Sequence, residues 1–243
     1  MIPVHVALVD DSKTVDPQDL ARVVGALNAQ VQNDVARVWG VAATVGAYPS
    51  APPQTWAIQL QAQLDQPGAL GYHSDDNNQP GAFVELDSSW TVTASHELIE
   101  MLVDPFGSRM TSARLPQNLN PQQIGLSSAT ALVHYLLEAC DPCENSSYPV
   151  GGVELSDFLL PAWYRSAPVG CAHYSHTGFC TQPRQVADGG YVSFAIGDGT
   201  FFQVFNEGGQ LQVQNLGKFN KASYGSLREW VDEKAREHRG SHA

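Results

Sequence analysis

The pattern of hydrophobic and polar positions is most regular in a stretch near the N-terminus, where it predicts a long helix. Asp16 and Pro17 supply a preferred capping residue and a preferred first-turn residue. Gly40 follows the last apolar position and ends the helix. The apolar stripe between these points consists of Leu20, Val23, Val24, Leu27, Val31, Val35 and Val38.

Residues 88–105 form a second predicted helix, which Asp87 or Ser88 caps and Pro105 ends. At 3.6 residues per turn, its polar residues share an arc of about 100°. The rest of the circumference is apolar, which is typical of a helix buried within a protein. The polar arc consists of Thr93, His96, Glu97, Glu100 and Asp104.

Shorter apolar runs bounded by turn residues predict strands in both halves of the chain. In the first half these runs are residues 3–9, 41–48, 54–64, 69–72 and 81–86. In the second half, glycine-rich turns separate runs at about 190–196, 201–205 and 210–215, and an amphipathic helix is predicted over 223–238.

The order of these elements predicts an α+β fold: a mixed β-sheet with a backing helix and a site helix. We expect an N-terminal subdomain over residues 1–105 that contains the site helix. Residues 106–243 form a smaller, β-rich C-terminal subdomain in this prediction, beginning with a long loop over 106–128. Because residues 81–86 directly precede the site helix, they are predicted to be an edge strand along which an extended peptide could pair.

The polar segment 73–80 lies between two of the predicted strands. Its oxygen-rich side chains could bind calcium, but it lacks the twelve-residue spacing with a central glycine and a closing acid. The segment therefore favours an exposed hairpin turn.

Composition restricts the possible functions. The chain has 243 residues, of which 43% are hydrophobic and 16% charged, as in a globular protein. Its net charge of −12 argues against nucleic acid or an anionic membrane as a partner. The sequence shows neither an apolar run of membrane-spanning length nor a signal peptide, so we expect a soluble protein. It would be cytoplasmic, or exported by a route that this chain does not encode.

The polar arc of the site helix is unusual because it holds three acids and a histidine without a basic residue. No Lys or Arg occurs between residues 38 and 108, and buried carboxylates need a cation. His96 and Glu100 have the i, i+4 spacing that directs two ligands at one metal ion, and Glu97 has the position of a general base. This HExxE pattern is the HExxH metallohydrolase pattern with glutamate as the second ligand. The alternative is a buried helix whose acids meet arginines such as Arg109, Arg114 or Arg165.

A second acidic segment, residues 131–144, offers a third ligand. No Lys or Arg occurs from 115 to 164, so these acids also lack a basic neighbour in sequence. Two such segments suggest a shared ion, with either Glu138 or Asp141 as the third ligand. In the alternative interpretation these carboxylates cap turns or are solvated.

The cysteines and one tyrosine leave further alternatives open. The four cysteines could form disulfides, remain thiols, or bind a structural metal together with His173 or His176. The pattern favours disulfides or thiols. Tyr191 could stabilise an oxyanion, although tyrosines of the core are more common. The cysteines are Cys140, Cys143, Cys171 and Cys180.

The two acidic segments together resemble a known group of proteins. Residues 95–105, SHELIEMLVDP, resemble the SHExxExxxDP signature of a group of zincin-like bacterial proteins and of the plant Exordium-like proteins. Residues 138–144, EACDPCE, are similar to the E-I-x-D-x-C-E segment that follows in the same group. The resemblance implies a zincin-like scaffold, with His96 and Glu100 at a metal and Glu97 as general base.

Two functions are compatible with these features. The first is a zinc-dependent metallopeptidase that hydrolyses peptide bonds in a peptide or protein substrate, with Zn²⁺ or another divalent ion as cofactor. A set of one histidine and two acids would neutralise the ion and make it a weaker Lewis acid than in HExxH enzymes. The second is a non-catalytic binding or structural protein that a metal stabilises.

Overall fold

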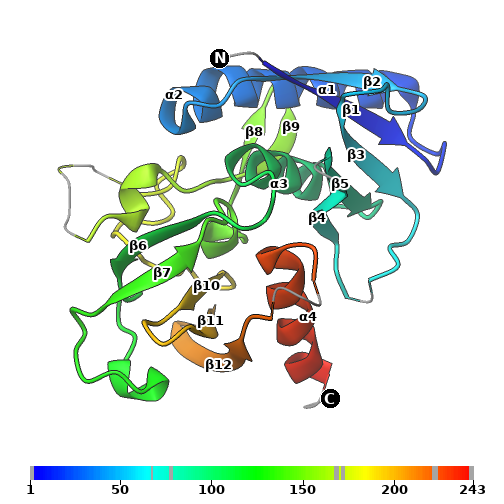
Figure 1. The fold of residues 1–243 in the computed structure, drawn as a ribbon. Coiled ribbons are helices and arrows are strands. Elements are labelled where there is room, and N and C mark those ends of the chain that lie inside the picture. The colour runs from blue at the N-terminus through cyan, green and yellow to red at the C-terminus, as the bar shows by residue number, and fades with distance from the viewer. Residues whose placement is uncertain are drawn as a thin grey trace. The chain divides into compact units, whose positions relative to one another are not determined.

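The computed structural model describes the chain in six segments: residues 3–66, 68–76, 79–166, 170, 173–220 and 224–240. Its contacts divide the chain into two compact units, whose elements Figure 1 labels. The first unit comprises Met1–Phe106 and Ser147–Asp157, and the second comprises Gly107–Ser146 and Phe158–Ala243. The assignment of Ser147–Asp157 to the first unit differs from the sequence prediction, which placed all of 106–243 in one C-terminal subdomain.

The first unit contains a five-stranded mixed sheet with strand order β2-β1-β3-β5-β4. Its strands are β1 Val4–Asp10, β2 Ala43–Tyr48, β3 Trp56–Gln61, β4 Gly71–Asp76 and β5 Gln79–Glu85. β1, β2, β3 and β5 pair in parallel, and β4 is antiparallel to β5. The edge strand beside β5 is therefore β4. The prediction that residues 81–86 form the edge was wrong, because β5 is paired on both sides.

The long N-terminal helix is confirmed. It consists of α1 Pro17–Gln30, a π-helical turn Val31–Val35, and α2 Ala36–Trp39. The Asp16 carboxylate caps it by accepting from the amides of the first turn. Gly40 ends it in the left-handed region, with φ of 66°, where glycine carries no steric penalty.

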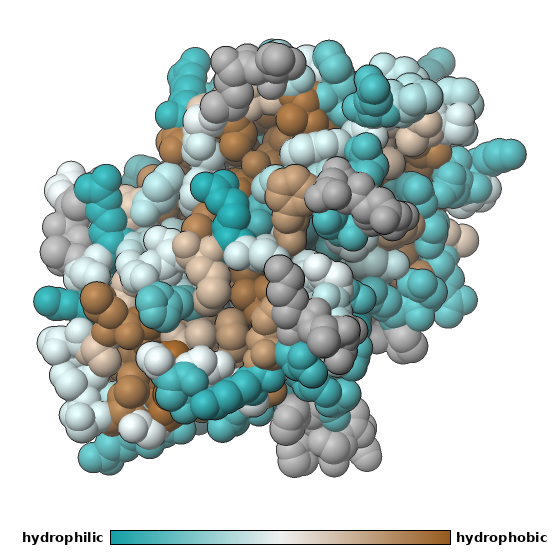
Figure 2. All heavy atoms as spheres, viewed as in Figure 1, coloured by the Kyte–Doolittle hydropathy of each residue, from teal (hydrophilic) through white to brown (hydrophobic). Residues whose placement is uncertain are grey.

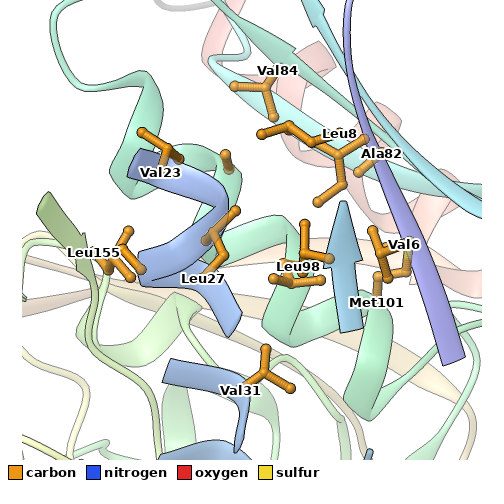
Figure 3. Packing of buried hydrophobic residues seen from close by; sticks show 14 of the residues in the cluster. Val6, Leu8, Val23, Leu27, Val31, Ala82, Val84, Leu98, Met101 and Leu155 are labelled. Carbon is orange, nitrogen blue, oxygen red and sulfur yellow. The ribbon is translucent and has the colours of Figure 1, made fainter. Parts of the chain in front are cut away.

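The site helix is α3, Trp90–Val103, within the predicted range. The hairpin of β8 Ser147–Val150 and β9 Val153–Ser156 also belongs to the first unit, and β9 contacts α3. A single hydrophobic cluster joins these elements, as Figure 3 shows for part of it. It includes Val6 and Leu8 of β1, Val23 and Leu27 of α1, Leu98 and Met101 of α3, and Leu155 of β9. Val6 and Leu8 lie at alternate positions of β1, so their side chains point to the same face of the sheet. Because residues of both α1 and α3 belong to this cluster, the two helices pack on that face.

The second unit contains a five-stranded antiparallel sheet with order β12-β11-β10-β7-β6 and the helix α4, Leu227–Gly240. Its strands are β6 Met110–Arg114, β7 Leu132–Leu136, β10 Tyr191–Ala195, β11 Thr200–Glu207 and β12 Gln210–Lys218. The three last strands and the helix confirm the prediction for the C-terminal part. β6 was missed, because it lies in the segment predicted to be a loop. α4 packs Leu227, Trp230 and Val231 into the core of this unit.

The two units together confirm the α+β class. On the face shown in Figure 2, hydrophobic residues lie in small groups separated by hydrophilic ones. Within the described residues, no helix has the length and apolar character that crossing a bilayer requires.

Candidate metal centre

The acids and histidine of α3 are buried rather than solvated. Glu100 is 0% exposed, Glu97 3% and His96 8%. His96 Nε2 lies 3.3 Å from Glu100 Oε2, one helical turn further along. The i, i+4 arrangement predicted from the sequence is therefore present, and both side chains are directed at one point.

A residue that the sequence analysis did not select joins this cluster from β4. His73 is only 4% exposed, although the segment 73–80 was predicted to be an exposed turn. Its Nδ1 lies 3.2 Å from Glu97 Oε2 and 3.9 Å from Glu100 Oε2. His73, Glu97 and Glu100 each offer one ligand atom, and these atoms all lie within 4.8 Å of one another. Strand β4 continues to Asp76, so residues 73–76 are not part of a turn. Asn77 and Asn78 lie outside the described residues.

Gly71 explains how β4 comes so close to α3. A Cβ atom at this position would lie 2.5 Å from Cγ2 of Thr93 and 3.0 Å from Oε1 of Glu97. Gly71 and His73 are two residues apart on a strand, so both face the helix. The missing side chain at Gly71 therefore leaves the space that Thr93 and Glu97 occupy.

We expect Gly71→Ala to destabilise the first unit by about 1–3 kcal/mol, because the added methyl group overpacks the β4–α3 contact. The shift of Thr93 and Glu97 would also disturb the spacing between His73 and Glu97. Urea unfolding of the variant and the wild type measures the loss. Gly25→Ala on α1 is a matched control, since a Cβ atom at Gly25 would meet nothing within 4 Å. Equal stability of Gly71→Ala and the wild type would contradict this account of the contact.

A buried polar network holds α3 in place on the side of Ser95. Ser95 Oγ donates to Gln30 Oε1 at 2.8 Å, and Gln30 Nε2 donates to the Ser156 carbonyl at 3.0 Å. The Ser156 amide donates to Ser95 Oγ at 3.1 Å, which closes the triangle. All three residues are fully buried. α1, α3 and β9 are thus linked next to His96, which restrains the helix that carries the site.

The predicted third ligands, Glu138 and Asp141, belong to the second unit and are buried there. Arg228 of α4 pairs with Glu138 and lies 3.7 Å from Asp141 Oδ2. These acids have no basic neighbour in sequence, but Arg228 approaches them from a distant part of the chain. A metal-binding role for Glu138 or Asp141 stays a prediction, and Asp141 has the looser contact with the guanidinium group.

Two other groups of candidates lie in the second unit. Loss of hydration raises the pKa of Tyr191 well above its usual value, with a further increase from the nearby Asp141 carboxylate. Tyr191 therefore stays protonated at neutral pH and keeps its hydroxyl donor.

Cys140, Cys143 and Cys180 are buried, and no disulfide joins any two of these three described cysteines. Cys171 lies outside the described residues.

The donor set of the first unit suits a divalent transition metal. Imidazole and carboxylate are typical ligands of zinc and its neighbours. Two donors at about 2.1 Å from one ion stand about 3.4 Å apart in tetrahedral geometry. His73 Nδ1 and Glu97 Oε2 are 3.2 Å apart, and His96 Nε2 and Glu100 Oε2 are 3.3 Å apart, so each of these two pairs is close to this value. His73 Nε2, the ring nitrogen that does not face Glu97 and Glu100, is buried and has no hydrogen-bond partner among the described residues.

Comparison with family models, with curated proteins and with solved structures finds no match for this chain.

Proposed function

We propose that the protein is a metal-dependent hydrolase of peptide bonds on a zincin-like scaffold. The observation that carries the proposal is the buried cluster on α3, where His96 and Glu100 converge at 3.3 Å with Glu97 beside them. Buried carboxylates of this kind are costly unless a cation compensates them. His96 and Glu100 supply an imidazole and a carboxylate that a divalent ion, zinc by preference, can bind.

The chain's own residues have distinct roles in this proposal. A bound metal would polarise the scissile carbonyl and lower the pKa of a water molecule. His96 and Glu100 hold the ion and fix its position relative to α3. Glu97 takes a proton from the attacking water and delivers it to the leaving amine. To accept that proton, the Glu97 side chain has to begin the reaction as a carboxylate.

The edge of the sheet supports a peptide as the substrate. β4 is one of the two edge strands of the five-stranded sheet in the first unit, and it carries His73 next to the acids of α3. An extended peptide could pair with the unpaired edge of β4 by main-chain hydrogen bonds. Such pairing would position a peptide bond beside the cluster and would make binding largely independent of side-chain sequence.

The second candidate is a protein in which the cluster binds a metal only for stability. His73, His96, Glu97 and Glu100 are all buried within the first unit. Their burial favours this alternative as much as it favours catalysis. It predicts a fall in melting temperature on metal removal, with no hydrolysis to lose.

The test is elemental analysis of the purified protein, followed by digestion of a mixed peptide library with and without a chelator. We expect about one divalent ion per chain and cleavage that chelation abolishes and added zinc restores. Metal-dependent stability without cleavage would support the second candidate. A metal-free protein that does not take up zinc would exclude both.

A further inference from the structure

We infer that His73 is a positioning residue for Glu97: it holds one oxygen of the carboxylate, and the other oxygen is left to accept the proton of the attacking water. This inference rests on the proposed hydrolase, in which Glu97 is the general base. His73 acts only through Glu97 in this arrangement and is not itself a ligand of the metal.

The contacts of the Glu97 carboxylate carry the inference. Its Oε2 lies 3.2 Å from Nδ1 of His73, within the range of a hydrogen bond. No other residue in the described part of the chain donates a hydrogen bond to this carboxylate. Oε1 therefore has no donor among these residues, and it is not completely enclosed by protein atoms. The two oxygens thus differ, since one is held and the other is open to water.

Burial makes the hydrogen bond an effective restraint on Glu97. Both residues are buried, so little water competes for the contact between Nδ1 and Oε2. A hydrogen bond to a carboxylate is also stronger than one between two neutral groups. A neutral imidazole that has its proton on Nδ1 donates to Oε2 and fixes the plane of the carboxylate.

Gly71 contributes to the same arrangement on the other oxygen. It lies two residues before His73 on β4, so both residues face α3. A Cβ atom at Gly71 would lie 3.0 Å from Oε1 of Glu97. The missing side chain therefore leaves room beside Oε1, while the imidazole contacts Oε2. Two residues of one strand thus determine the surroundings of both carboxylate oxygens.

The competing interpretation is that His73 only fills space between β4 and α3 and contributes to stability. The two roles differ in their dependence on Glu97. A positioning residue matters for the rate only while Glu97 serves as the base, so its loss should have little effect on the rate of Glu97→Gln. A packing residue should give the same loss in the wild type and in Glu97→Gln.

The experiment is a double-variant cycle on the full chain with zinc bound, and it uses the best substrate from the peptide library. His73→Leu removes the donor, and we expect its kcat to fall by about 10–100-fold with KM unchanged, as for the loss of other supporting hydrogen-bond partners. His73→Asn should recover most of this loss, because its amide donates from nearly the same place as Nδ1. When combined with Glu97→Gln, His73→Leu should change kcat by less than about threefold.

His5→Leu is the control, because His5 is an exposed histidine on β1 that is bonded to Thr44. It should have wild-type kcat. If His73→Leu does not fold, His73→Met takes its place in the cycle, since the flexible methionine adapts to the same space.

Two results would overturn the inference and leave the proposed hydrolase in place: wild-type kcat of folded, zinc-loaded His73→Leu, or an equal loss of kcat with and without Glu97→Gln. A zinc-loaded wild type that hydrolyses no peptide would overturn both the inference and the proposed function.

Discussion

Glu97→Gln is expected to abolish hydrolysis while the protein keeps its metal and its fold. The amide is nearly the same size as the carboxylate, so the packing against Gly71 and Thr93 is retained. It cannot accept the proton of the attacking water, and loss of a general base costs about 10²–10⁴-fold in rate. We expect kcat/KM to fall by that factor, chiefly through kcat, because the amide leaves the metal ligands and the substrate contacts unchanged.

The measurement uses the best substrate from the peptide library, with metal content determined on the same samples. Glu154→Gln is a suitable control, because Glu154 is an exposed glutamate of β9 in the same unit and accepts a hydrogen bond from Ser147. It should have wild-type activity. Activity of Glu97→Gln within about tenfold of the wild type would show that Glu97 is not the base, even if zinc is bound as proposed.

The local part of this site could be predicted from the sequence because its signals are local. The spacing of His96, Glu97 and Glu100 on a helix follows from 3.6 residues per turn and requires no knowledge of the fold. The same holds for the long helix, where Asp16 and Gly40 mark the two ends. Capping residues and apolar periodicity act over a few residues, so a helix can be predicted from them without knowledge of the tertiary structure.

Strand pairing could not be predicted in the same way. Which strand forms the edge depends on contacts between residues far apart in the chain, and the local sequence of a strand does not specify its neighbours. β5 pairs with β3 on one side, at Ile58 and Ala82, and with β4 on the other. The return of β8 and β9 to the first unit is likewise a long-range contact, made through Ser156 and Gln30.

His73 was missed because its neighbours are polar. Ser74 and Asp75 follow it, and such a run predicts a turn. The useful signal was the alternation of Gly71 and His73, which places a small residue and a metal-binding residue on one face of a strand. Arg228 was missed for a different reason: α4 was correctly predicted as an amphipathic helix, but no spacing in the sequence links Arg228 to Glu138 and Asp141.

Arg228→Met is expected to lower the free energy of unfolding of the second unit by about 3–5 kcal/mol, the cost of removing one partner from a buried charge cluster. Arg228 is only 4% exposed. Its guanidinium group contacts Glu138, and its Nε donates to Asp232 Oδ2 at 2.9 Å. Methionine keeps the apolar stem of the side chain, so the loss reports on the charge rather than on packing.

The position of Arg228 in the fold makes it difficult for Glu138 and Asp141 to gain contacts with water when the guanidinium group is removed. Its backbone amide donates to the Gly107 carbonyl at 2.8 Å, which ties the first turn of α4 to the start of the unit. A Cβ at Gly107 would lie 2.8 Å from Cβ of Arg228, so the two segments are in close contact. The carboxylates of Glu138 and Asp141 therefore cannot reach water by a small movement of the helix.

Urea unfolding of Arg228→Met and of Lys234→Met tests this expectation. Lys234 pairs with Glu237 on the same helix, but both are partly exposed, and such surface pairs contribute about 0–1 kcal/mol. The double variant Arg228→Met, Glu138→Gln should recover part of the loss, because it also removes one of the uncompensated carboxylates. If Arg228→Met lost no more stability than Lys234→Met, Glu138 and Asp141 would not depend on the guanidinium group. In that case a metal-binding role for either carboxylate would gain support.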